Sequence, residues 1–393
     1  MANTLTNLIP DIYAALDVVS RELVGFIPAV GRDSSADRVA INQTLRIPIS
    51  PANAAGGNIT PAMAFPSAAD QTFTNKTLTI TKSRFFPFSW SGQEEMAVNS
   101  GVGYLTLKQD QIAQAIRAAI NEMESDIATA AYLGASRAYS SHATTPPAVF
   151  GTAGDYSDAA NVRKILDDNG APLSDRTLVV NTTAGAAIRG KQAQAYMAGD
   201  TSLQRNGVLF DINGFAIRES AQVPTVTAGS MSGGVMASGA LTVGQTSLAL
   251  KNATGTGTVA AGDIITLAND TNKYVVAAAS FAGANPATGD TITLAAPGIR
   301  MAQSAAERAI TVVGSSTRNI AFSRNAILLA TRLPHIPGEG DLASDRMSIT
   351  DPISGISLEF AVYPGFRMNV YHVSVAWGVT VIKPEHCAIL LGN

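Results

Sequence analysis

The feature that most constrains this chain is one long stretch of helical periodicity, residues 105–135. Apolar side chains recur there every three or four positions, which places them on one face of an α-helix; they are Ile112, Ile116, Ile120, Met123, Ile127 and Ala131. Thr106 and Gln109 have the spacing of a capping box, and Gly134 is suited to end the helix. Roughly 28 residues make a rod on the order of 40 Å long. Taken alone, such a helix fits the core of an enzyme as well as any other architecture.

Two unusual segments precede this helix. Residues 3–27 carry an amphipathic stripe, which predicts a helical arm that either caps the chain's own core or docks on another subunit. Residues 33–83 contain two extended stretches around a tip rich in Pro and Gly, which predicts a β-hairpin. Neither face of its return strand, residues 72–83, is strongly apolar, and a lone hairpin is marginally stable in water. The hairpin is therefore expected to be partly exposed or to pack on a neighbour.

A dense group of aromatic side chains follows the hairpin at once; its members are Phe85, Phe86, Phe88 and Trp90. Aromatic side chains contribute large buried areas to cores. A core anchor at the point where the hairpin rejoins the domain is therefore favoured over a ligand-binding box.

Beyond the helix the chain changes character twice. Helices and strands alternate first, as in an α+β or α/β domain; the expected elements are residues 158–169, 177–181, 184–198 and 215–218. From 223 to 313 helical periodicity disappears, and Gly262 and Gly289 each begin a Gly-Asp turn before an alternating strand. This stretch predicts an inserted β domain, a small barrel or sandwich. The end returns to mixed structure, with strands expected at residues 356–362, 368–381 and 388–391, and a strand or short helix at 323–333.

Motifs that carry chemistry are missing from the sequence. It contains no phosphate-binding loop, no nucleophile elbow and no H-E-x-x-H pair. The four histidines are scattered without partners at metal-ligand spacing; they are His142, His335, His372 and His386. Glu385, His386 and Cys387 are adjacent, but on an extended strand they would point to opposite faces. No catalytic, cofactor-binding or metal-binding residue is predicted, and the chain is not expected to be an enzyme, although triads can form from distant residues.

The charge and the cysteine content further narrow the classes of protein to which this chain can belong. The 27 Lys and Arg against 30 Asp and Glu give a net charge of −3, so no overall field attracts nucleic acid. The single cysteine, Cys387, excludes an internal disulfide framework and fits folding in a reducing cytoplasm. The first ten residues have no signal-peptide pattern, and the longest uncharged stretch is too broken for a membrane span.

The order of these parts resembles the major capsid proteins of tailed bacteriophages, which share the HK97-type fold. The branch in short-tailed lambdoid phages, whose coat protein carries an inserted β-barrel, is the most similar. The stretches that carry the resemblance are LVVN from Leu178, GFAIRES from Gly214, RNIAFS from Arg318 and WGVTVIKPE from Trp377.

The resemblance implies a division of the chain into parts. It implies an N-terminal arm, an extended loop that overlaps a neighbouring subunit, a peripheral domain with the spine helix 105–135, an axial domain, and an inserted β-barrel domain. The corresponding residues are 1–32 for the arm, 33–83 for the loop, 84–149 and 348–393 for the peripheral domain, 150–222 and 314–347 for the axial domain, and 223–313 for the barrel.

The resemblance also implies a function. The chain would self-assemble as pentamers and hexamers into an icosahedral shell around viral DNA, with a scaffolding protein, a portal protein and a possible decoration protein as partners. Its location would be the virion capsid, assembled in the host cytoplasm, with no membrane contact. Lys76 and Lys82 lie in the loop where some members form covalent crosslinks, but no partner asparagine or catalytic acid is evident, so crosslinking is not predicted.

Two other classes remain open from sequence. One is another phage assembly protein, such as a tail-tube subunit or a β-rich adhesin, against which the long helix and the mixed C-terminal part count. The other is a cytosolic α/β enzyme with a β insertion, which would need a deep polar pocket with perturbed carboxylates or histidines.

Overall fold

The structure is a computed structural model, and it describes residues 24–49, 61, 74–99, 104–152, 155–191, 209, 211–251, 255–350 and 355–393. Of the expected N-terminal helix, residues 3–27, only the last four lie within this part of the chain. Nearly all of the hairpin tip and the side chain of Thr106, the first residue of the expected capping box, lie outside it.

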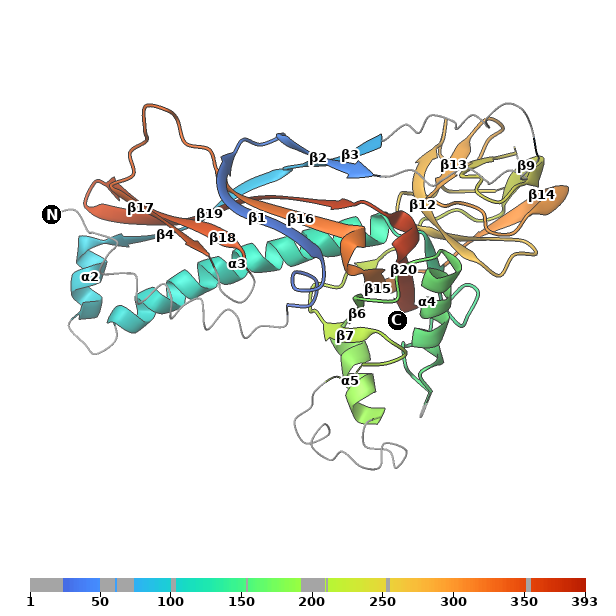
Figure 1. The fold of residues 1–393 in the computed structure, drawn as a ribbon, viewed down its shortest axis with the longest axis horizontal. Coiled ribbons are helices and arrows are strands. Elements are labelled where there is room, and N and C mark those ends of the chain that lie inside the picture. Colours follow the sequence, from blue (N-terminus) through green and yellow to red (C-terminus); the bar gives the residue numbers. More distant parts are fainter. Residues whose placement is uncertain are drawn as a thin grey trace.

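The long helix is the longest element of the fold and runs along most of the molecule (Figure 1). It is α3 (Tyr104–Leu133), and all six side chains of the predicted stripe are buried. Gly134 ends it by donating its N–H to the Ala130 carbonyl at 2.9 Å. A Cβ on Gly134 would lie 2.6 Å from Val381, so the last turn of the helix lies directly against the C-terminal strands. The prediction from helical periodicity is confirmed.

One sheet lies along this helix in the order β1-β16-β19-β18-β17, with β4 paired to β19. Its apolar side chains and those of α3 form one continuous core. The predicted strand 368–381 is present with those bounds, and the undecided stretch 323–333 is a short 3-10 turn followed by a strand. The elements are α2 (Gly92–Asn99), β1 (Gly31–Val39), β4 (Lys82–Ser91), η3 (Arg324–Ala326), β16 (Ile327–Pro334), β17 (Asp345–Thr350), β18 (Ser357–Gly365) and β19 (Met368–Val381).

A second sheet begins beyond the C-terminal end of α3 and has the order β7-β6-β15-β20-β5-β12-β11-β14-β9. Helices α4 (Ser157–Asp168) and α5 (Thr182–Lys191) pack on its first strands around a separate apolar cluster. Those strands are β5 (Arg137–Tyr139), β6 (Arg176–Val180), β7 (Ala216–Glu219), β8 (Thr225–Val226), β15 (Ser316–Ser323) and β20 (Cys387–Gly392), with the turn η4 (Pro384–His386) before β20. The alternation of helices and strands expected for residues 158–218 is confirmed for its described part.

The stretch expected to be an inserted β domain is all strands and loops. It contains β9 (Gly234–Leu241), β10 (Ser247–Ala249), β11 (Ile264–Leu267), β12 (Lys273–Ser280), β13 (Thr291–Leu294) and β14 (Gln303–Val312). The ladders join β12 to β11, β11 to β14, β14 to β9, β10 to β13 and β13 to β12. A bridge between Met236 and Leu250 connects β9 to the end of β10, so the pairings run in a closed ring around an apolar cluster.

The strand pairings cross the division expected from the resemblance. β16 lies in the expected axial segment 314–347 but pairs with β19, and β20 lies in the expected peripheral segment 348–393 but pairs with β15. The chain changes sheet at both 3-10 turns, because η3 lies between β15 and β16 and η4 lies between β19 and β20.

The aromatic run after the hairpin forms part of strand β4. Alternation along β4 turns Phe86, Phe88 and Trp90 toward the core, and the Phe88 ring lies 5.1 Å from that of Tyr371. Phe85 points the other way and is 59% exposed. The core-anchor prediction therefore holds for three of the four side chains and is wrong for Phe85, because a strand directs adjacent residues to opposite faces.

Candidate subunit-contact surfaces

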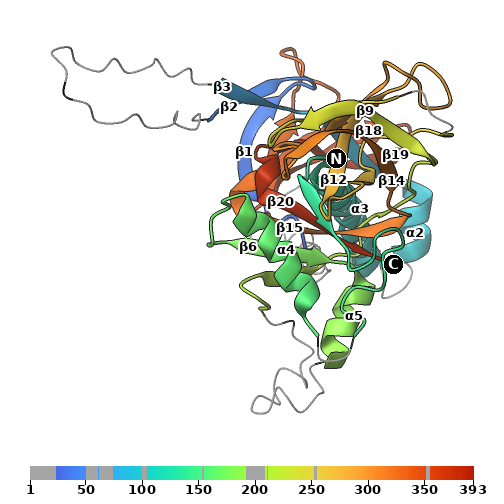
Figure 2. The ribbon, with the colours of Figure 1, turned by 90° about the vertical axis from the view of Figure 1, so that its right-hand side faces the viewer.

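The hairpin is a separate two-stranded sheet that projects from the body of the molecule (Figure 2). Its strands are β2 (Thr44–Ile49) and β3 (Thr74–Thr79), paired in antiparallel register from Thr44 opposite Thr79 to Ile49 opposite Thr74. Side chains alternate along β2 between exposed and half-buried. Beneath them lies a small apolar cluster formed by Val39, Leu78, Ile80, Ala330 and Ala376, against which Leu45, Ile47 and Leu328 pack. Such a small core supports the base of the hairpin and leaves one side of it exposed.

Close backbone packing fixes the base of the hairpin on strand β19. A Cβ on Gly378 would lie 2.1 Å from the Thr79 carbonyl oxygen, a distance at which something must shift. Thr81 donates its N–H to the Trp377 carbonyl at 3.1 Å, and Lys76 donates from Nζ to the Ile382 carbonyl at 2.6 Å. The angle at which the hairpin leaves the body is thus set by backbone contacts and by a tethered lysine.

An ion-pair cluster joins the first residue of β4, directly after the hairpin, to the long helix. Lys82 Nζ lies 2.8 Å from Glu122 and 2.9 Å from Asp126, and the Trp377 indole donates to Asp126 at 2.9 Å. Burial alone would lower the pKa of Lys82, but the hydrogen bonds and charges of Glu122 and Asp126 raise it above its ordinary value. This lysine, considered above as a crosslinking residue, is thus held at the base of the hairpin by two carboxylates of α3.

A buried carboxylate anchors the chain that enters β1. Glu124 of α3 accepts the backbone N–H groups of Phe26 at 3.0 Å and Ile27 at 2.8 Å, and the Ser220 hydroxyl at 3.1 Å. Burial raises the pKa of this carboxyl in spite of these hydrogen bonds. The described start of the chain is therefore fastened to the middle of the long helix, so a segment N-terminal to it departs from a fixed point.

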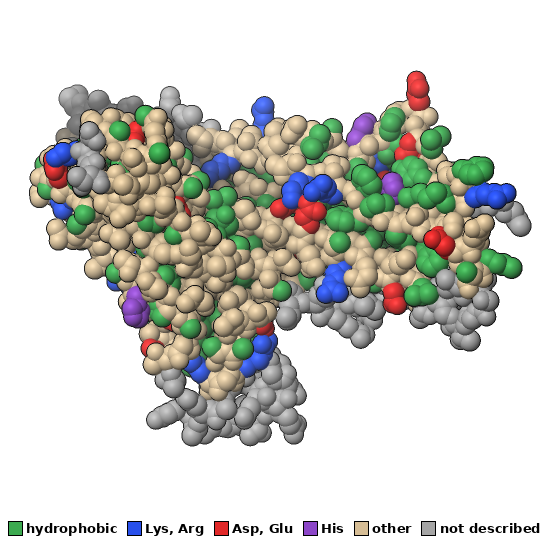
Figure 3. All heavy atoms as spheres, turned by 180° about the vertical axis from the view of Figure 1, so that it is seen from behind, with side chains coloured by type: hydrophobic (Ala, Val, Ile, Leu, Met, Phe, Trp, Pro, Cys, Tyr) green, Lys and Arg blue, Asp and Glu red, His purple; other side chains and the backbone are tan. Residues whose placement is uncertain are grey.

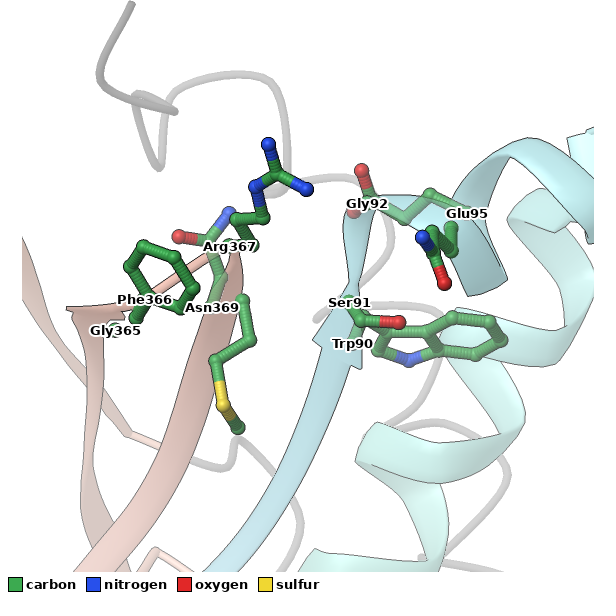
Figure 4. Close-up of a pocket in the computed structure, with 10 residues that line it drawn as sticks. Trp90, Ser91, Gly92, Glu95, Gly365, Phe366, Arg367 and Asn369 are labelled. Atoms are coloured by element: carbon green, nitrogen blue, oxygen red, sulfur yellow. The ribbon is translucent and has the colours of Figure 1, made fainter.

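The far end of the first sheet carries a hollow of about 630 Å³ between the β18–β19 turn and the start of α2 (Figure 4). Phe366 and Arg367 stand on the turn, while Trp90 and Glu95 stand opposite on β4 and α2. Phe366 is 91% exposed, an unusual state for a phenylalanine in a water-facing turn. The complete lining is Trp90, Ser91, Gly92, Gln93, Glu95, Gly365, Phe366, Arg367, Met368 and Asn369.

Further apolar side chains are exposed around this end. In Figure 3 hydrophobic side chains gather over the part of the molecule that carries β4, β18 and β19. Met96 of α2 is 78% exposed, and Phe85 stacks on the His372 ring with centroids 4.8 Å apart. Exposed apolar patches of this kind mark surfaces that contact other proteins. The end of the molecule distal to the second sheet is therefore, with the hairpin, a candidate contact surface; we name it the distal tip and define it by Met96, Phe366 and Met368.

The residues considered for chemistry from sequence do not gather in one place. Within the described residues no three His, Cys, Asp or Glu side chains lie close enough to hold a metal ion. Burial lowers the pKa of His372, which stacks between Phe85 and Tyr363. Glu385 and His386 lie in the 3-10 turn η4 and not on an extended strand as assumed above, whereas Cys387 begins β20, where burial raises its pKa.

Sequence reasoning missed the features that define the contact surfaces. It assigned no role to Phe366, although an apolar residue in the tight turn between two good strands is a usable signal. It also assigned no role to Glu124, and Arg318 entered only as the first residue of the RNIAFS stretch, yet both side chains are buried. None of the described helices is long and apolar enough to cross a membrane.

Comparison with known proteins identifies likeness in structure alone. No family model matches the chain, and no curated protein matches it in sequence. A structure titled as the capsid of Cyanophage P-SCSP1u aligns over 93% of this chain and 86% of its own, at 11% identity and a TM-score of 0.48. A structure from Mycobacterium phage Che8 aligns over 95% of this chain and 90% of its own, at 13% identity and a TM-score of 0.44. The capsid structure of a native GTA particle aligns over 95% of this chain and 91% of its own, at 9% identity and a TM-score of 0.46.

These structures are of the kind that the sequence resemblance names.

Proposed function

We propose that this chain is a major capsid protein that self-assembles into a closed icosahedral shell around viral DNA. The observation that carries the proposal is the projecting hairpin β2–β3. A two-stranded ribbon is marginally stable by itself, yet the contacts of Gly378, Lys76 and Lys82 hold its base rigidly against the body. A rigid, half-covered arm gains stability when a second copy of the chain covers its exposed side.

The distal tip supports the same function. An exposed Phe366 beside an open hollow is unfavourable in an isolated subunit, because apolar surface in water costs about 25 cal/mol per Å². Burial against another subunit removes that cost. The low net charge of −3 opposes dense packing of identical chains only weakly.

We propose a division of the chain that follows the strand pairings. A peripheral domain holds α3 with β4, β16, β17, β18 and β19; an axial domain holds α4, α5, β6, β7, β15 and β20; and residues 223–313 form an inserted β-barrel, supported by the closed ring of pairings. This differs from the sequence-based division in the places of β16 and β20. The arm 1–32 and the hairpin β2–β3 keep their proposed roles as contacts to neighbours, whereas residues 33–39 of the expected loop belong to β1 in the first sheet.

The partners and the location follow from the resemblance and are part of the proposal. They are a scaffolding protein and a portal protein during assembly, a decoration protein on the finished shell, and packaged DNA inside it. Assembly takes place in the host cytoplasm and the product is the virion capsid.

A charge reversal on the exposed side of the hairpin tests the proposal. Arg46 of β2 is exposed and lies opposite Thr77 of β3, so Arg46→Glu changes the outward surface and leaves the core beneath untouched. Lys164→Glu, an exposed residue of α4, is the matched control. We expect Arg46→Glu to give folded, unassembled subunits while the control forms shells like the wild type, as measured by light scattering and negative-stain microscopy. Equal assembly of both variants would contradict a role for the hairpin.

A further inference from the structure

A second hollow, of about 350 Å³, lies where the chain passes between the two sheets. Its walls are the loop before β6 and the turns η3 and η4, and the Arg324 N–H donates to the Asp175 carbonyl at 3.0 Å across it. The lining residues are Pro172, Ser174, Asp175, Ser323, Arg324, Asn325, Lys383 and His386. Neither the hairpin nor the distal tip uses this place.

Three basic side chains converge here without ion pairs. Arg324, Lys383 and His386 form none with any described residue, whereas eight other arginines of the described part of the chain do. Asp175 shares the hollow and also forms no ion pair there. The charges of Arg324 and Lys383 exceed that of Asp175, so the hollow is net positive before His386 takes up a proton.

We propose that this hollow is a phosphate-binding site. Arg324 and Lys383 supply charge-assisted donors, and the Ser174 hydroxyl and the Asn325 amide supply neutral ones, which together suit the oxygens of a tetrahedral anion. At about 30 Å³ for each water, the space admits the anion with part of its water shell. The phosphate is either a free ion or a phosphodiester of a polynucleotide, and the site does not depend on the shell function proposed above.

The surroundings of His386 provide an internal reporter. Burial lowers the pKa of His386, Lys383 and Arg176 lower it further, and Glu385 opposes them. A bound phosphate adds negative charge and raises the pKa of this imidazole. The chain has four histidines, so carbon-13-labelled histidine gives a spectrum in which His386 can be assigned by its His386→Gln variant.

The test titrates full-length subunits with inorganic phosphate and, separately, with a short DNA duplex. Lys383→Gln removes one positive charge and with it a charge-assisted hydrogen bond, and the loss of about 1.5 kcal/mol corresponds to roughly ten-fold weaker binding. Asp175→Asn removes the opposing charge and retains a residue that tolerates the positive φ of 54°, so it should bind phosphate more tightly. Lys164→Gln, at an exposed position of α4, is the control and should bind as the wild type does.

The outcomes separate the sources of phosphate and decide the proposal. A rise in the pKa of His386 on addition of inorganic phosphate supports the site. The phosphate affinity obtained from this rise should be highest for Asp175→Asn, intermediate for the wild type and lowest for Lys383→Gln. The same order of affinities for the duplex, with binding weakened by added salt, assigns the site to a polynucleotide backbone. A response to inorganic phosphate alone assigns the site to the free ion. Identical titrations of all variants, or an unchanged pKa of His386, would overturn it.

Discussion

The substitution Arg318→Met is predicted to stabilise the folded subunit. Arg318 lies on β15 with 0% of its surface exposed, and none of its three guanidinium nitrogens has a hydrogen-bond partner within the described part of the chain. Asp263 contributes a favourable charge, but its two oxygens already accept the N–H groups of Gly229 and Ala260. The charge is therefore buried and left unsatisfied, which is costly.

The size of the effect follows from the pKa of the guanidinium. Burial lowers the pKa of Arg318 to about 10, whereas the charge of Asp263 opposes the shift. Against an ordinary value of about 12.5, at about 1.4 kcal/mol for each factor of ten, the charged form is penalised by about 3 kcal/mol in the folded state. Methionine fills most of the same space, and a small residual void costs about 1 kcal/mol. The net gain is about 2 kcal/mol.

Urea unfolding of dissociated subunits measures this gain as a higher midpoint with an unchanged slope. The penalty is fully present below the folded-state pKa of about 10 and is relieved only as the pH rises through it, so the gain should be constant at lower pH. Arg318→Lys keeps a charge in the same place and should show no gain. A Met variant less stable than the wild type would refute the reasoning, because it would mean that the guanidinium is satisfied in solution.

Three further substitutions test the anchors and the distal tip. Glu124→Ala leaves the N–H groups of residues 26–27 without an acceptor and should cost about 2–3 kcal/mol in urea unfolding. Glu122→Ala breaks two partly exposed ion pairs, with Lys82 and Arg84, and should cost below about 1 kcal/mol. Gly378→Ala displaces Thr79 and should reduce shell yield in light scattering, while Gly190→Ala, with open space around its Cβ, should not. Phe366→Ser should abolish assembly without changing subunit stability, because the side chain is 91% exposed; unaltered shells by microscopy would show that the distal tip makes no contact.

Local periodicity made part of the fold predictable. The stripe from Ile112 to Ala131 repeats every three or four residues, and residues 368–381 alternate, so each segment determines its own secondary structure. The pairing of β16 with β19 and of β20 with β15 depends instead on two short turns, whose direction no periodicity encodes.

The buried anchor, the basic hollow and the distal tip were harder to predict from the sequence for a related reason. Glu124 is polar and helical, and only the distant residues Phe26 and Ser220 make its burial favourable. Arg324, Lys383 and His386 belong to two segments about 60 residues apart in sequence and meet only because η3 and η4 fold side by side. Exposure of Phe366 depends on the turn that the two strands share. Such features arise from tertiary contacts and not from a local pattern.

Electron microscopy of the purified full-length chain, made with and without a candidate scaffolding protein, tests the central proposal most directly. We predict uniform closed shells in at least one of the two preparations, with a particle mass from light scattering far above that of a single chain. A stable monomer of 40.6 kDa in both preparations would contradict it.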